Sequence, residues 1–156
     1  MLVPTPQLLN QARQHRYAVG AFNVYSLEGV RAVVAAAEAL NSPAILQLLP
    51  TALELGGTPL IACCLAAARA ARVPMSVHLD HCSSKTTIEK ALAAGISSIM
   101  ADGSHLPYDR NLAFTRRMTA LATSREKSVE AELGRLSGTE DGITIDEREA
   151  RLTDPA

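Results

Sequence analysis

The sequence contains no tryptophan, and only three tyrosines and two phenylalanines occur among its 156 residues. Proteins that bind single-stranded nucleic acids usually stack the bases on aromatic side chains, so this composition argues against such a surface. An excess of positive charge is also missing, because 15 basic residues face 16 acidic ones and the formal net charge is −1. A phosphate backbone or an anionic membrane attracts a basic face. We therefore expect no nucleic-acid partner and no membrane partner.

Long apolar runs and paired cysteines are missing as well. No uninterrupted apolar run reaches the roughly 18 residues of a membrane helix, and the first residues lack the charged and apolar regions of a signal peptide. The three cysteines include the adjacent pair Cys63 and Cys64, an odd count without the spacing of a disulfide framework. We expect reduced thiols and a cytoplasmic protein. The length, within the usual range of roughly 100–200 residues, indicates a single domain over 1–156.

Short apolar stretches alternate with longer helical ones along the whole chain. Helices separated by apolar strands are typical of βαβ units and of a parallel sheet. The pattern predicts strands at 18–24, 44–49, 75–79, 96–101 and 129–133, and helices at 4–16, 26–40, 58–71, 86–94 and 110–122.

Polar residues share one face in two of these strands. In 75–80 and again in 129–133 the even positions are polar, including His78, Asp80 and Glu132, while the odd positions are apolar. Buried charge without partners is costly, so the polar face must look into a site rather than into a hydrocarbon core. In a closed barrel, helices outside cover the apolar face of each strand, and the polar face turns toward a polar mouth. A flat doubly wound sheet explains this arrangement less well.

Acidic and imidazole groups lie where the predicted strands end: Asp80, His81, Asp102 and Glu132. The strand ends of a barrel converge on one mouth, so residues far apart in sequence can meet there. Histidine with carboxylates suits a divalent metal such as zinc, and a neighbouring acid can transfer a proton. A plainer interpretation stays open, in which His81 is a hydrogen-bonded structural residue, Asp102 belongs to a turn and Glu132 faces water.

Four segments resemble the class II, zinc-dependent ketose-bisphosphate aldolases in both order and spacing, and the fructose- and tagatose-bisphosphate branch in particular. These segments are Ala21–Asn23, His78–His81, Asp102–Tyr108 and Glu130–Arg135. The resemblance covers almost the whole chain. It implies a (β/α)8 TIM barrel, an α/β fold, of which this chain contains about the first five β/α units.

The resemblance also implies roles for single residues. Asp80 matches the residue that transfers a proton at the C4 hydroxyl of the substrate, and His81 matches a ligand of the catalytic zinc. Asp102 and Glu132 match positions of a second or alternative metal site close to the first. The implied cofactor is therefore Zn2+, which would act as a Lewis acid.

The implied reaction is the reversible cleavage of fructose or tagatose 1,6-bisphosphate to dihydroxyacetone phosphate and glyceraldehyde 3-phosphate. The partner is thus a phosphorylated ketose, and Asn23 and Gln47 match polar positions that line its pocket. The rival aldolase mechanism needs a lysine that forms a Schiff base in an apolar pocket. All three lysines of this chain lie in polar stretches outside the predicted strands, which disfavours that mechanism.

The chain is shorter than a complete barrel, which takes about 250 residues. In the family the other two zinc histidines and the phosphate-binding loop lie beyond the part matched here. A half-barrel has open sheet edges that favour pairing with another chain, so we expect a homo-oligomer. The alternative function is a catalytically incomplete half-barrel that acts only through oligomerisation or partner binding. Cys82, next to His81, is interpreted as a small packing residue rather than as a competing zinc thiolate.

Overall fold

The computed structural model describes residues 1–134, 138–140 and 143–146. Five parallel strands form one sheet in the order β1-β2-β3-β4-β5, and a separate antiparallel pair, β6 and β7, follows. The strands are β1 (Gly20–Asn23), β2 (Ala44–Leu48), β3 (Met75–Cys82), β4 (Ser98–Ala101), β5 (Ser128–Ala131), β6 (Gly138–Glu140) and β7 (Ile143–Ile145). The predicted parallel α/β architecture is confirmed.

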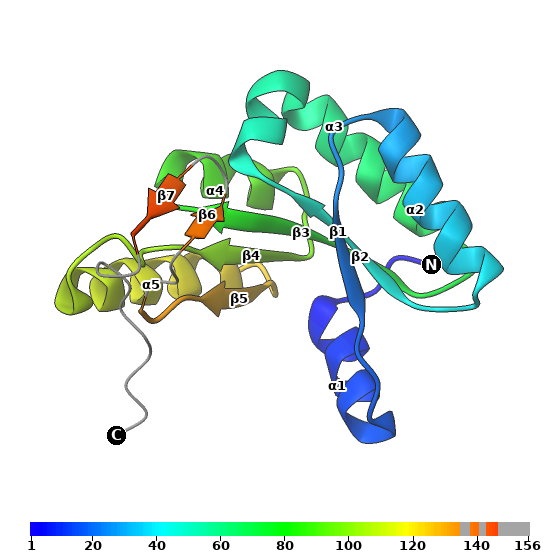
Figure 1. The fold of residues 1–156 in the computed structure, drawn as a ribbon, viewed down its shortest axis with the longest axis horizontal. Coiled ribbons are helices and arrows are strands. Elements are labelled where there is room, and N and C mark those ends of the chain that lie inside the picture. The colour runs from blue at the N-terminus through cyan, green and yellow to red at the C-terminus, as the bar shows by residue number, and fades with distance from the viewer. Residues whose placement is uncertain (135–137, 141–142, 147–156) are drawn as a thin grey trace.

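A helix precedes β1, and one helix joins each strand of the sheet to the next. The helices are α1 (Thr5–His15), α2 (Leu27–Ala39), α3 (Pro50–Ala70), α4 (Lys85–Ala93) and α5 (Tyr108–Thr123). In Figure 1, α2 and α3 lie on one side of β1 and β2, and α1 lies on the other. The local sequence sets several boundaries: the Ser26 side chain accepts the Gly29 N–H at the start of α2, and Gly95, at φ 94°, follows the end of α4.

The prediction that a helix begins at Thr58 is wrong. Helix α3 begins at Pro50, and non-helical backbone at Gly57 (φ 54°, ψ −157°) bends it just before Thr58. Thr58 and Pro59 carry the features of a helix start because a second helical segment does begin there. Pro50 lies in the first turn of α3, where proline is tolerated, and the break at Gly57 separates this earlier segment from the predicted helix.

Among the described residues, α3 is long and apolar enough to cross a membrane by length and composition, with 21 residues and a mean hydropathy of 1.5. Core helices of globular domains meet the same criterion. Helix α3 packs against β2 and β3 and against α2, and its residues Leu60, Ile61 and Leu65 are buried. We therefore interpret α3 as a core helix of this fold.

The main core lies between the sheet and the helices that cover its outer face. Fully burying a large apolar side chain there contributes about 1.5–3 kcal/mol relative to leaving it exposed. Its strand residues include Leu46, Leu48, Val77, Leu79 and Ile99, and its helix residues include Val30, Ile61, Ile88 and Met118. This burial confirms that the odd positions of β3 form its apolar face.

The opposite, inner face of the sheet carries a row of polar residues. The strand register aligns Asn23, Gln47, His78, Ser98 and Ser128 side by side across all five strands. Neighbours in register point to the same face of a sheet. The inner face therefore carries one polar row, which in β3 agrees with the predicted alternation, whereas Ile45 on the same face of β2 packs with Val3 and Leu8 in a second apolar cluster.

Candidate active site

A β-bulge near the end of β3 turns two adjacent residues away from the core. Leu79 pairs with Ile99 and Cys82 pairs with Ala101, so Asp80 and His81 together oppose a single residue of β4. His81 has a positive φ of 42°, which side chains other than glycine adopt only rarely. Bulges re-aim side chains next to active sites. Here the bulge brings both Asp80 and His81 to the end of the strand, where the site was expected.

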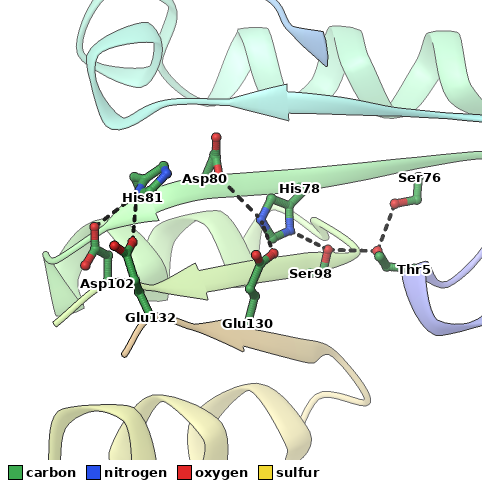
Figure 2. A network of polar contacts seen from close by, with 9 residues as sticks. All are labelled: Thr5, Ser76, His78, Asp80, His81, Ser98, Asp102, Glu130 and Glu132. Carbon is green, nitrogen blue, oxygen red and sulfur yellow. Dashed lines mark hydrogen bonds and ion pairs between the residues drawn. The ribbon is translucent and has the colours of Figure 1, made fainter. Parts of the chain in front are cut away.

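Three of the predicted site residues meet at this point. The Nδ1 atom of His81 lies 3.0 Å from Oδ2 of Asp102 and 3.7 Å from Oε2 of Glu132. One ligand atom from each residue lies within 4.8 Å of the others, and all three residues are half-buried. Figure 2 shows the three side chains converging from β3 and from the ends of β4 and β5. One imidazole and two carboxylates form a donor set that zinc accepts.

The carboxylate of Asp102 is held by two partners. The hydrogen bond with His81 is the largest cause that keeps the pKa of Asp102 well below its usual range. The backbone N–H of Ser104 donates to Oδ1 of Asp102 at 2.9 Å and acts in the same direction. Asp102 is therefore ionised at neutral pH and is oriented toward His81.

The backbone of Glu132 is fixed by a residue that sequence reasoning missed. The buried Asn111 of α5 donates through Nδ2 to the carbonyl oxygen of Glu132 at 2.8 Å. A Cβ atom on Gly103 would lie 2.3 Å from Oδ1 of Asn111, so only glycine fits beside this amide. Asn111 thus contacts the segments that follow β4 and β5. A buried asparagine on a helix leaves no periodic signal in the sequence that points to these contacts.

A second polar group surrounds His78, one of the polar even positions of β3. Its Nε2 lies 3.8 Å from Oδ1 of Asp80 and 3.6 Å from Oε2 of Glu130, while its Nδ1 lies 2.7 Å from Oγ of Ser98. Burial, followed by the nearby charge of His81, lowers the pKa of His78 from 6.5 to about 4. The imidazole is therefore neutral at physiological pH.

The remaining candidates lie around these two groups. Asn23 and Gln47 belong to the polar row of the inner face, at the ends of β1 and β2 next to β3. His105, which belongs to the segment Asp102–Tyr108 that carries the family resemblance, is exposed. Arg135, the last residue of a segment that carries the family resemblance, lies outside the described residues.

Comparison with known proteins gives one consistent family. The model of class II fructose-bisphosphate aldolases matches residues 3–156. A fructose-bisphosphate aldolase of Thermus caldophilus is 44% identical over 155 residues, which make up 99% of this chain and 51% of that protein.

Solved structures agree with this result. A candidate fructose-1,6-bisphosphate aldolase from Coccidioides immitis is 40% identical, with a TM-score of 0.84 over 90% of this chain and 50% of that one. The YdjI aldolase from Escherichia coli K12 is 30% identical, with a TM-score of 0.82 over 86% of this chain and 53% of that one. The chain thus spans about half the length of these relatives. The predicted fold, the first five β/α units of a class II aldolase barrel, is confirmed.

Proposed function

Because this chain belongs to the class II fructose-bisphosphate aldolase family, we propose that it carries out the aldol cleavage of a ketose 1,6-bisphosphate. The substrate is fructose or tagatose 1,6-bisphosphate, and the products are dihydroxyacetone phosphate and glyceraldehyde 3-phosphate. The observation that carries the proposal is the bulge in β3, which holds Asp80 next in sequence to His81, while His81 groups with Asp102 and Glu132. A proton-transfer residue next to a metal site is what this reaction requires.

The residues that would hold zinc are His81, Asp102 and Glu132. Their donor atoms and their negative charge fit a divalent cation, and the Ser104 and Asn111 hydrogen bonds keep Asp102 and Glu132 in place beforehand. Zinc, when bound, supplies Lewis-acid stabilisation of the negative charge that develops on the ketone side of the substrate.

Asp80 would remove the proton of the C4 hydroxyl as the C3–C4 bond breaks. Its side chain is largely buried but still 13% exposed, so it remains accessible from the surface. A carboxylate at such a site acts as a general base, a contribution that typically accelerates a reaction about 10²–10⁴-fold. Asn23 and Gln47, at the ends of β1 and β2, are suitably placed to bind substrate hydroxyl groups.

A second candidate function is a non-catalytic half-barrel that acts through self-association. Among the described residues, β1 pairs only with β2, its four residues are all exposed, and Phe22 is 49% exposed. An exposed edge strand with an apolar side chain is a template for pairing with another chain. This observation supports a homo-oligomer, with or without catalysis.

The cytoplasm is the compartment that fits both candidates. The cysteines Cys63, Cys64 and Cys82 are all free thiols, and disulfides are rare where thiols are kept reduced.

Cleavage of fructose and tagatose 1,6-bisphosphates by the purified 156-residue chain tests the proposal. We expect release of dihydroxyacetone phosphate with zinc, none after chelation, and a loss of roughly 10²-fold or more in Asp80→Asn. Sedimentation at several protein concentrations runs in parallel. Absence of cleavage by a folded chain that associates with increasing concentration would favour the non-catalytic half-barrel.

A further inference from the structure

A chain of buried hydroxyl groups joins helix α1 to His78. Oγ1 of Thr5 lies 2.8 Å from Oγ of Ser76 and 2.7 Å from Oγ of Ser98, and Oγ of Ser98 lies 2.7 Å from Nδ1 of His78. All four residues are buried, with exposed fractions between 0% and 6%. Figure 2 shows the chain running from Thr5 toward the carboxylates of the site.

The other nitrogen of His78 faces two carboxylates. Its Nε2 is buried and forms no hydrogen bond within the described part of the chain. The nearest acidic atoms are Oδ1 of Asp80 at 3.8 Å and Oε2 of Glu130 at 3.6 Å. These distances exceed hydrogen-bond range, so the interaction at this geometry is electrostatic. Hydrogen bonds of catalytic groups are often long without substrate and shorten when it binds.

The hydrogen bond between Ser98 and Nδ1 of His78 can run in two directions, and because each hydroxyl carries one hydrogen, donation from Ser98 to His78 also fixes the direction of the other bonds. In one, Ser76 donates to Thr5, Thr5 to Ser98, and Ser98 to Nδ1 of His78, which leaves the ring proton on Nε2. In the other, Nδ1 carries the ring proton and donates to Ser98, which leaves a bare lone pair on Nε2.

The surroundings of Nε2 distinguish the two directions. A bare lone pair facing the carboxylates of Asp80 and Glu130 would be repelled, whereas an N–H dipole is attracted to them. In a low-dielectric interior this difference is larger than in water. The direction that starts at Ser76 is therefore favoured, and the hydroxyl chain holds the ring in one tautomer and one orientation, because the hydrogen bond at one ring nitrogen sets the proton on the other.

We propose that Thr5, Ser98 and His78 form a positioning relay, in which the Nε2–H of His78 orients the carboxylate of Asp80 for proton transfer. The assignment of proton transfer to Asp80 rests on the proposed function, but the order of the hydrogen bonds does not. His78 is a positioning residue, because it acts on the reaction through Asp80. The relay also gives α1, at the far end of the chain of hydroxyls, a defined link to the site.

The tautomer of His78 can be measured without any turnover. Long-range 1H–15N spectra of the 15N-labelled 156-residue chain report which ring nitrogen of each histidine is protonated, and His78→Gln assigns the His78 signals. We expect His78 as the neutral Nε2–H form at pH 7. A proton on Nδ1, or a mixture of both tautomers, would overturn the relay.

A matched pair of variants tests whether the Nε2–H orients Asp80. His78→Gln places an amide N–H where Nε2–H was, whereas His78→Asn retains an acceptor near Ser98 but cannot reach the carboxylates. In crystal structures of the two variants, we expect the Asp80 carboxylate to stay in place in His78→Gln and to move or split into two conformers in His78→Asn. Identical positions in both variants would overturn the positioning role, and thermal unfolding of each shows that both are folded.

Turnover separates this inference from the proposed function. If the chain cleaves ketose bisphosphates, His78→Asn should lower kcat by about tenfold, equivalent to about 1.4 kcal/mol, with little change in KM. His78→Gln should restore most of the rate. If no variant and no wild-type chain cleaves substrate while the tautomer and the Asp80 positions are as expected, the proposed function fails and the relay stands.

Discussion

Leu79 and Cys82 lie three residues apart in β3, yet both pack into the core between the sheet and its helices. In a regular strand an odd separation puts two residues on opposite faces. The bulge at Asp80 and His81 absorbs the extra residue, so neither of these two side chains enters the core. The site therefore depends on a local irregularity of the backbone as much as on the identity of its residues.

The positive φ of His81 predicts an unequal response to two substitutions that both remove the imidazole. A left-handed conformation costs about 1–2 kcal/mol in most residues, asparagine tolerates it best, and β-branched residues tolerate it worst. We expect His81→Val to have a free energy of unfolding roughly 1–2 kcal/mol lower than that of His81→Asn. Urea denaturation measures both, and equal stabilities would show that the backbone of this bulge is not constrained.

Gly103 is predicted to be intolerant of a single added methyl group. In Gly103→Ala the new Cβ would push Asn111 away, and the hydrogen bond to Glu132 would be lost. We expect destabilisation of about 1–3 kcal/mol, together with weaker zinc binding. Gly29→Ala is the control, since its nearest contacts begin at an ordinary 3.9 Å and alanine favours a helix. Wild-type zinc affinity in Gly103→Ala would show that Asn111 does not position Glu132.

The lowered pKa of His78 predicts a loss of stability in mild acid. The unfolded chain takes up a proton as the pH falls through 6.5, whereas folded His78 remains neutral until about pH 4. The contribution of His78 to the free energy of unfolding is therefore complete above pH 6.5. Between pH 6.5 and 4 this contribution declines by roughly 3 kcal/mol in total, at about 1.4 kcal/mol per pKa unit.

The control for this pH dependence is His78→Gln, which has no titrating group at this position. The difference in free energy of unfolding between wild type and variant should shift with pH across this window. If the free energies of unfolding of wild type and His78→Gln changed in parallel with pH, His78 would not be the group that titrates in this window.

Asp102 contributes to the pH dependence of stability at lower pH. Its pKa is depressed from 3.8, so its stabilising negative charge is lost only in stronger acid.

The buried thiol of Cys82 is predicted to take no part in metal binding. Burial raises the pKa of Cys82, and the side chain packs in the core on the face away from the site. Cys82→Ala should therefore keep the zinc affinity of the wild type. A loss of zinc affinity beyond the roughly 10–100-fold caused by changing residues that only support the ligands would identify Cys82 as a ligand instead.

Much of the fold could be predicted because hydrophobic alternation is a local signal. The polar even positions of β3 and β5 indicated an inner face lined with functional groups, and burial of Val77 and Leu79 on the other face agrees with this. Asp80, His81, Asp102 and Glu132 could be proposed from the sequence because they lie at or just after the ends of strands that meet.

The features that could not be predicted from the sequence depend on contacts between distant segments or on backbone geometry. No glycine marks the bulge at His81, so no local signal indicates that two adjacent residues turn away from the core together. Thr5 lies 93 residues from Ser98, and nothing local in either segment indicates that their hydroxyl groups meet. Helix α3 was shortened in the prediction because the break at Gly57 hides the segment before it.

The central claim is that His81, Asp102 and Glu132 act together as one zinc site, and calorimetric titration of the full chain with zinc tests it most directly. We predict binding of a single ion, weakened at least about tenfold, or about 1.4 kcal/mol, by alanine at any of the three positions. His105→Ala serves as the control, because His105 is an exposed histidine outside this group. Undiminished affinity in His81→Ala, or an equal loss in His105→Ala, would contradict the account.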